Sequence, residues 1–92
     1  MKKEEIKKGY YDSRKLEWEI PYTDGKVNGV SKTYYENGKV YLETPFTDGK
    51  ENGLAKGYYE SGNLRWEVPY ADGKAGKTTY HKDITKNHDT EN

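Results

Sequence analysis

A repeat of 24 residues constrains this chain more than any other feature of its sequence. The units start at positions 10, 34 and 58, each with two adjacent tyrosines: Tyr10-Tyr11, Tyr34-Tyr35 and Tyr58-Tyr59. A partial fourth unit starts at Tyr80, and no repeat signal follows it. We therefore divide the chain into a repeat array, residues 1–82, and a polar C-terminal tail, residues 83–92.

Each unit has the pattern of a β-hairpin. The second unit carries Asn37-Gly38 at its first turn, which is the strongest short hairpin signal, and Asp-Gly follows later in every unit. Between the two turns, apolar residues alternate with polar ones, as in a half-buried strand. We expect an all-β fold: an antiparallel meander of about seven short strands in an elongated, twisted, single-layer sheet.

A two-residue turn fixes the pairing of the strands on either side of it. If Glu36 pairs with Lys39, then Lys32 faces Glu43, and the same rule sets a lysine opposite a glutamate in the other two hairpins. The rule also places Gly9 and Gly57 opposite Trp18 and Trp66, where a large ring can cover a bare strand position.

The register separates the sheet into two faces. One face carries the tryptophans and aliphatic residues with Tyr11, Tyr35 and Tyr59, and we expect it to be the core. Tyr22 and Tyr70 alternate in step with the tryptophans and belong to the same face. The other face carries the lysine–glutamate pairs with Tyr10, Tyr34, Tyr41, Tyr58 and Arg65, and Tyr34 lies opposite Tyr41. Because Tyr and Arg are enriched at binding hot spots, we predict a partner-binding surface on this second face, made of Tyr10, Tyr34, Tyr41, Tyr58, Arg65, Lys32 and Glu43. The alternative is that these tyrosines are good strand formers that half-cover a twisted sheet.

Composition excludes several functional classes. The 16 basic residues balance the 16 acidic ones, which argues against non-specific nucleic-acid binding. The chain has no cysteine, and no apolar run is long enough to span a membrane. The N-terminal segment lacks the apolar stretch of a secretory signal, so we expect a cytoplasmic protein without a membrane partner.

The sequence offers little catalytic chemistry. The only histidines, His81 and His88, fall at the end of the array and in the tail, and we expect no metal site. The glutamates that recur in the hairpins each face a lysine, whereas a catalytic pair needs unequal environments. We therefore expect no enzyme activity, no catalytic residue and no cofactor.

The repeat resembles the variant form of the MORN repeat, whose consensus runs near G-x-x-K-x-Y-Y-x-N-G-K-L. Residues 29–40 fit it nearly throughout, residues 53–64 fit with Ser61 and Asn63 as departures, and the first unit departs at Arg14. The resemblance implies hairpin repeats and a platform that binds other molecules. Short bacterial chains of this kind resemble the YwqK family, which implies an antitoxin or immunity protein with a toxin as its partner. A scaffold that self-associates through open strand edges, and a lipid- or cell-wall-associated module, remain alternatives.

Overall fold

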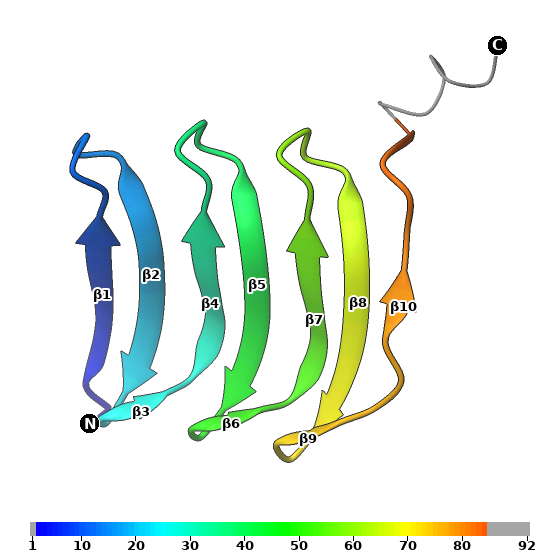
Figure 1. The fold of residues 1–92 in the computed structure, drawn as a ribbon. Coiled ribbons are helices and arrows are strands. Elements are labelled where there is room, and N and C mark those ends of the chain that lie inside the picture. The colour runs from blue at the N-terminus through cyan, green and yellow to red at the C-terminus, as the bar shows by residue number, and fades with distance from the viewer. Residues whose placement is uncertain (1, 85–92) are drawn as a thin grey trace, which may run out of the picture.

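The structure, a computed structural model, describes residues 2–84, and its elements are all β-strands (Figure 1). In chain order they are β1 (Glu4–Tyr10), β2 (Leu16–Thr23), β3 (Lys26–Val27), β4 (Gly29–Tyr34), β5 (Val40–Thr47), β6 (Lys50–Glu51), β7 (Gly53–Tyr58), β8 (Leu64–Ala71), β9 (Lys74–Ala75) and β10 (Thr79–Tyr80). Seven of them follow one another across an antiparallel sheet in the order β1-β2-β4-β5-β7-β8-β10, and the two-residue strands β3, β6 and β9 pair beside them. The predicted all-β meander is confirmed.

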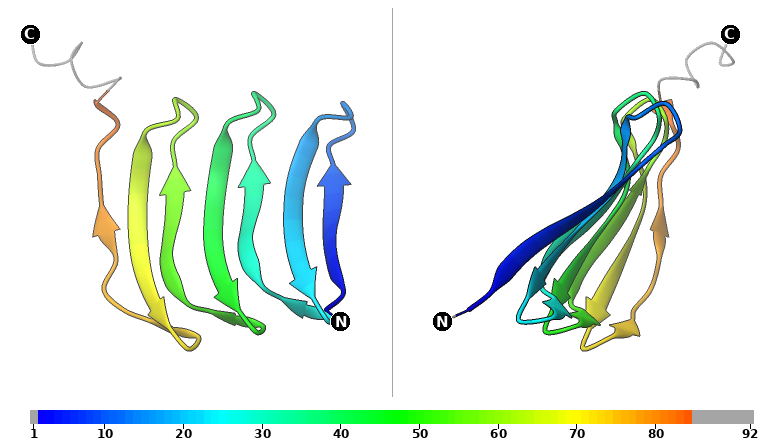
Figure 2. Two further views of the ribbon diagram at one scale, coloured as in Figure 1. Left: turned by 180° about the vertical axis from the view of Figure 1, so that it is seen from behind. Right: turned by 90° about the vertical axis from the view of Figure 1, so that its left-hand side faces the viewer.

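The sheet is a single curved layer, as its edge-on view shows (Figure 2). The described chain contributes no element that covers either face of this layer. Each hairpin contacts only the hairpins beside it, as expected for a repeat array. None of residues 2–84 belongs to a helix with the length and apolarity to cross a membrane.

Two kinds of turn alternate along the sheet, at its two ends (Figure 1). The Asp-Gly turns are two-residue connections with positive φ at both positions, for example 52° at Asp24 and 83° at Gly25, where Thr23 pairs with Lys26. This is the type I′ geometry, whose twist matches that of the strands. The predicted turns at the three Asp-Gly sites are confirmed.

The turns at the other end are not the two-residue turns that we predict from Asn37-Gly38. The backbone N–H of Tyr35 donates to the carbonyl of Lys39 at 2.9 Å, and that of Gly38 donates to the carbonyl of Tyr35 at 3.0 Å. Gly38 has a φ of 90°. The three residues 36–38 therefore form a type I turn followed by a left-handed residue, which is the usual three-residue hairpin loop.

A β-bulge next to each of these loops restores the predicted register. Tyr34 pairs with Val40 and Thr33 with Leu42, so Tyr41 is an extra residue without a direct partner. The prediction that Tyr34 faces Tyr41 is therefore wrong. The predicted pairing of Lys32 with Glu43 is confirmed, because the longer loop shifts the register by one residue and the bulge shifts it back.

The first loop carries Arg14 at the left-handed position that glycine occupies in the other two, with a φ of 76°. A left-handed conformation costs a residue with a Cβ about 1–2 kcal/mol, while glycine adds flexibility to the unfolded chain. We expect Arg14→Gly to raise the free energy of unfolding by up to about 1 kcal/mol. Chemical denaturation measures this change; Gly38→Ala, the reverse change in the second loop, should destabilise the protein. A less stable Arg14→Gly variant would contradict the assigned loop geometry.

The face with the tryptophans forms the thin core of the sheet. Trp18 and Trp66 face Gly9 and Gly57 as predicted, and a Cβ on Gly57 would lie only 2.3 Å from an atom of the Trp66 ring. Ala55 and Val68 are buried on this face, whereas the tryptophans are only half-buried. The expected core face is thus the better-buried one, although the described chain lays no second layer over it.

The opposite face carries an apolar stripe that the alternation does not predict. It is a row of cross-strand pairs near the Asp-Gly end: Ile6 with Pro21, Val30 with Pro45, and Leu54 with Pro69. The aliphatic members remain exposed, at 64% for Ile6 and 43% for Val30 and Leu54. Both faces of the sheet therefore offer apolar surface.

Candidate functional site

A row of alternating charge crosses the sheet on the face opposite the tryptophans, which we call the Lys–Glu face. Besides the three predicted pairs within hairpins, Glu19 faces Lys32 and Glu43 faces Lys56 between hairpins. The row is therefore continuous over six strands: Lys8, Glu19, Lys32, Glu43, Lys56 and Glu67. Neighbouring opposite charges favour this register over the alternatives.

The carboxylates of this row also bind the first tyrosine of the following unit. The hydroxyl of Tyr34 donates to Glu19 Oε2 at 3.0 Å, and Glu43 acts on Tyr58 in the corresponding position of the next unit. Burial raises the pKa of both tyrosines, and the neighbouring glutamates, Glu19 for Tyr34 and Glu43 for Tyr58, raise it further. Tyr34 and Tyr58 therefore connect successive hairpins.

These bonds predict a loss of stability at alkaline pH. A tyrosine whose pKa is raised in the folded state contributes stability that is fully present below the unfolded value of 10.0 and is lost as the pH rises above it. We therefore compare the thermal unfolding midpoint at pH 9 and pH 11, about 1 unit below and above that pKa. Between these two values the midpoint of the double variant Tyr34→Phe, Tyr58→Phe should decrease less than that of the unmodified protein. Tyr80→Phe is the control, because Tyr80 is 76% exposed; identical pH profiles for all three proteins would contradict the prediction.

The second tyrosine of each pair bonds in the opposite direction, to the backbone of the next unit. The hydroxyl of Tyr35 donates to the carbonyl of Tyr58 at 2.6 Å, and Tyr11 donates in the same way to the carbonyl of Tyr34. Each junction between hairpins therefore has two reciprocal tyrosine contacts, one from each side. This arrangement explains why the tyrosines occur as adjacent pairs.

The end of the array uses His81 where the other units have a first tyrosine. Tyr59 donates to the carbonyl of His81 at 2.6 Å, and His81 Nε2 lies 3.2 Å from Glu67 Oε1. Tyr80 pairs with Trp66, as Gly57 does on the other side of β8, so Tyr80 occupies the position of that glycine and not of a first tyrosine. The predicted start of the fourth unit at Tyr80 is therefore shifted by one residue relative to the earlier units. His88 lies outside the described residues, and no three metal-type side chains cluster within residues 2–84.

Asp83, which the sequence assigns to the tail, belongs structurally to the array. It is only 7% exposed and accepts hydrogen bonds from the hydroxyl of Ser61 at 3.1 Å and the amide of Asn63 at 2.9 Å. Ser61 and Asn63 are the two positions where the third unit departs from the repeat consensus. The rest of the predicted tail, from residue 85 onward, lies outside the described residues.

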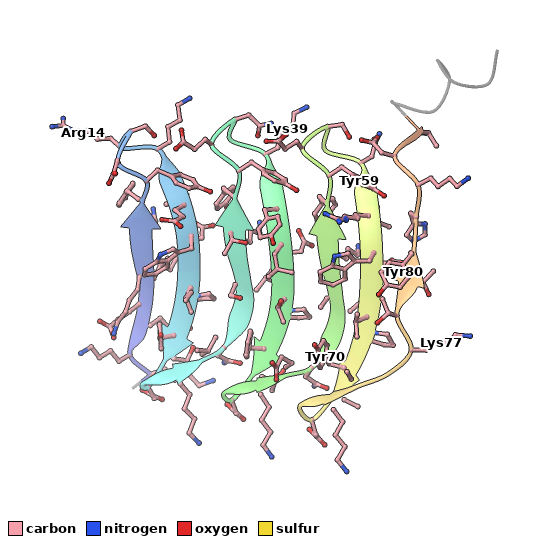
Figure 3. All side chains as sticks on the ribbon, viewed as in Figure 1. Arg14, Lys39, Tyr59, Tyr70, Lys77 and Tyr80 are labelled. Atoms are coloured by element: carbon pink, nitrogen blue, oxygen red, sulfur yellow. The ribbon has the colours of Figure 1, made fainter. Side chains whose placement is uncertain are left out.

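The bulge residues lie beside the second tyrosines and form a mixed surface near the three-residue loops. The rings of Tyr35 and Tyr41 meet edge to face with centroids 5.1 Å apart, and the Arg65 guanidinium lies 5.4 Å from the centroid of Tyr59. We call this set the tyrosine row; it consists of Glu17, Tyr11, Tyr41, Tyr35, Arg65 and Tyr59. Figure 3 shows Tyr59 at the end of β8 that adjoins the three-residue loop, and Tyr70 at the opposite end.

Electrostatic coupling runs along the tyrosine row. Partial desolvation and then the carboxylate of Glu17 raise the pKa of Tyr11. Burial raises the pKa of Tyr35, and the positive charge of Arg65 opposes that shift. The bulge position thus changes from acidic to aromatic to basic along the sheet, while the backbone around it stays the same.

The structure divides the seven predicted partner-binding residues into three places. Lys32, Glu43, Tyr34 and Tyr58 lie half-buried on the Lys–Glu face. Tyr41 and Arg65 lie in the tyrosine row instead, because the bulge breaks the alternation and brings Tyr41 against Tyr35, which we expect on the other face. Tyr10 is 58% exposed at the end of β1.

Sequence reasoning missed the second tyrosines as part of this surface. The alternation assigns Tyr11, Tyr35 and Tyr59 to the core, because it takes no account of the bulges that bring Tyr41 against Tyr35 and Arg65 against Tyr59. The signal that was available is the variation of the bulge position, which holds Glu17, Tyr41 and Arg65 in otherwise similar units.

Comparison with known proteins identifies the repeat. No curated protein and no solved structure matches the chain. The sequence model of the family described as MORN repeat variant matches twice, and each match contains one complete hairpin, β4–β5 in the first and β7–β8 in the second. MORN repeats indicate a repeat-built binding or scaffold module. The second and third hairpins of this chain, within residues 27–48 and 51–72, thus match the MORN repeat variant.

Proposed function

We propose that this chain is a non-catalytic protein-binding module that neutralises a bacterial toxin by direct binding, as an antitoxin or immunity protein in the cytoplasm. The observation that carries the binding role is the tyrosine row. It presents aromatic rings at a fixed spacing, with a neighbouring position that varies between Glu17, Tyr41 and Arg65. Toxin neutralisation itself rests on the resemblance to short bacterial chains of this repeat type.

The chemistry of the row suits a protein partner. Tyr41 is 48% exposed and Arg65 is also exposed, and both are residue types that dominate binding energy at protein interfaces. The half-buried tyrosines next to them are held by hydrogen bonds to the backbone, so they lose little conformational freedom when a partner binds. A graded row, acidic at one end and basic at the other, also fixes the orientation of the partner.

The test is binding to the product of the neighbouring gene. We expect a one-to-one complex of nanomolar affinity or tighter by isothermal titration calorimetry. The double variant Tyr41→Ala, Arg65→Ala should weaken it by at least about tenfold, since truncating one hot-spot residue alone costs about 2 kcal/mol or more. Lys50→Ala is the matched control, because Lys50 is exposed at the opposite end of the sheet. If no neighbouring product binds, toxin neutralisation is wrong; if binding survives the double variant, the tyrosine row is not the interface.

A second candidate function is a scaffold that assembles through its sheet edges. It is favoured by β1, a seven-residue strand at the edge of the sheet that pairs with β2 alone. Long unpaired edges are templates for pairing with another chain.

A further inference from the structure

The outer edge of β1 presents a regular set of backbone groups. The carbonyl of Lys3 accepts from the N–H of Asp24 at 2.8 Å, so Lys3 directs its backbone groups towards β2. Because this direction alternates along a strand, Glu4, Ile6 and Lys8 direct theirs towards the outer edge. Within residues 2–84 no strand pairs with that edge. The opposite edge of the sheet is protected differently, because β10 has only two residues.

The side chains of β1 differ from those of its counterparts in the other units. The strands β4 and β7 carry Gly29-Val30-Ser31 and Gly53-Leu54-Ala55, where β1 carries Glu5-Ile6-Lys7. Among these three strands, the additional charges therefore occur only in β1, which lies at the edge of the sheet. Charges on an edge strand commonly prevent pairing, but here their order matters.

The order Glu4-Glu5-Ile6-Lys7-Lys8 is self-complementary. We propose that two copies of this chain form a two-fold dimer by pairing β1 with β1 antiparallel, centred on Ile6. In this register Glu4 faces Lys8 of the second copy and Glu5 faces Lys7 of the second copy, and each contact occurs twice. The proposal is independent of toxin binding, since it uses the edge of the sheet and not its tyrosine row.

Geometry allows few other registers. Only Glu4, Ile6 and Lys8, which direct their backbone groups outward, can exchange hydrogen bonds with a second copy. Every symmetric pairing must therefore place even-numbered residues of one copy opposite even-numbered residues of the other. A two-fold axis moved from Ile6 to the neighbouring positions places Glu5 opposite Glu5, or Lys7 opposite Lys7. Like charges directly opposite one another are unfavourable, so the centred register is selected.

The interface extends contacts that already run through the sheet. Lys8 faces Glu19 on its own hairpin and would face Glu4 of the second copy on the other side, which extends the alternating row of each chain by one glutamate of the other. Backbone pairing of Glu4, Ile6 and Lys8 from both copies supplies about six hydrogen bonds. Ile6, which is 64% exposed, meets its own copy at the centre.

The first experiment measures the molar mass of the full chain by light scattering over a series of concentrations. We expect the mass to rise from the 10.7 kDa of the monomer to twice that value, and the dimer to weaken as salt increases, since screening acts on exposed charge pairs. A mass that stays at 10.7 kDa at concentrations up to about 1 mM overturns the proposal.

Charge exchange tests the register itself. Glu5→Lys and Lys7→Glu each place like charges opposite one another in the homodimer, so each should weaken dimerisation about tenfold or more. An equimolar mixture of the two variants restores opposite charges at both positions and should form a mixed dimer. Glu5 has no charged partner opposite it within the chain, because it faces Tyr22, so its substitution leaves the hairpin pairing in place. Dimerisation of the single variants as strong as that of the unmodified chain, or a mixture that does not associate, overturns the register.

A backbone variant separates edge pairing from other forms of association. Ile6→Pro removes an outward N–H that the hairpin does not use, which an edge strand tolerates, and it should abolish the dimer while the circular dichroism spectrum stays that of the folded protein. Val30→Thr, at the equivalent position of the internal strand β4, is the control and should dimerise normally. A dimer that survives Ile6→Pro with a folded spectrum places the interface elsewhere and overturns the proposal.

Discussion

Trp66→Ala should lower the free energy of unfolding by about 3 kcal/mol, the lower end of the range for truncating a large aromatic residue. The lower end applies because Trp66 is half-buried and the described chain lays nothing over it. Its ring lies on the bare backbone of Gly57, so its removal exposes the strand β7 as well as its own neighbours. Urea denaturation monitored by circular dichroism measures the change.

A double-mutant cycle shows whether the Trp66–Gly57 contact is the cause. A Cβ on Gly57 would lie 2.3 Å from Trp66, so Gly57→Ala should destabilise the unmodified protein. In the Trp66→Ala background the space is free, and the same substitution should be neutral or stabilising by about 0.5–1 kcal/mol, because glycine weakens strand interiors. If Gly57→Ala has the same effect in both backgrounds, the indole does not rest on the glycine.

Removing two hydroxyls at the junctions should have the next largest effect. We expect the double variant Tyr35→Phe, Tyr59→Phe to lower the free energy of unfolding by about 2–3 kcal/mol, since each hydroxyl makes a hydrogen bond worth about 1 kcal/mol and leaves a carbonyl without a partner when it is lost. Those carbonyls belong to Tyr58 and His81, each in the next unit of the array. Thermal unfolding of each single variant and of the double variant measures the effects.

The control for this pair is Tyr22→Phe. Tyr22 lies on the Trp face at the Asp-Gly end, with Lys7 4.8 Å from its ring, and the structure gives its hydroxyl no hydrogen bond among the described residues. Its substitution should change stability by less than about 0.5 kcal/mol. Equal losses for Tyr22→Phe and for either junction variant would show that the hydroxyl bonds contribute nothing.

The strand pairing of this protein is predictable from its sequence, although one step of the reasoning is wrong. The two-residue loop predicted at Asn37-Gly38 has three residues, and the bulge at Tyr41 compensates for it. Alternating apolar residues constrain the register over the whole strand, whereas loop length is a local choice between two favourable geometries. The pairing of Lys32 with Glu43 is therefore correct even though the loop that suggested it is different.

The candidate site is less predictable, for a physical reason. The assignment of side chains to faces assumes that every second side chain of a strand lies on the same face. This alternation is interrupted at the two bulges that contain Tyr41 and Arg65. The hydroxyl of Tyr35 bonds to the backbone of another unit, and no pattern of residue types within one unit reveals such a partner. Two of the seven predicted residues, Tyr41 and Arg65, nevertheless lie in the row that we propose as the binding surface.

The repeated junctions have a consequence for how this fold can change in size. Every hairpin is joined to the next by the same two tyrosine contacts and the same charge pair, and no contact described for the array skips a unit. A further 24-residue unit inserted between the second and third would form the same junction with each of its neighbours, so the sheet would lengthen without other changes. Each such unit would add one tyrosine and one freely chosen neighbour to the binding row. The reach of the protein and its specificity can thus be altered separately, the first by the number of units and the second by a single residue in each.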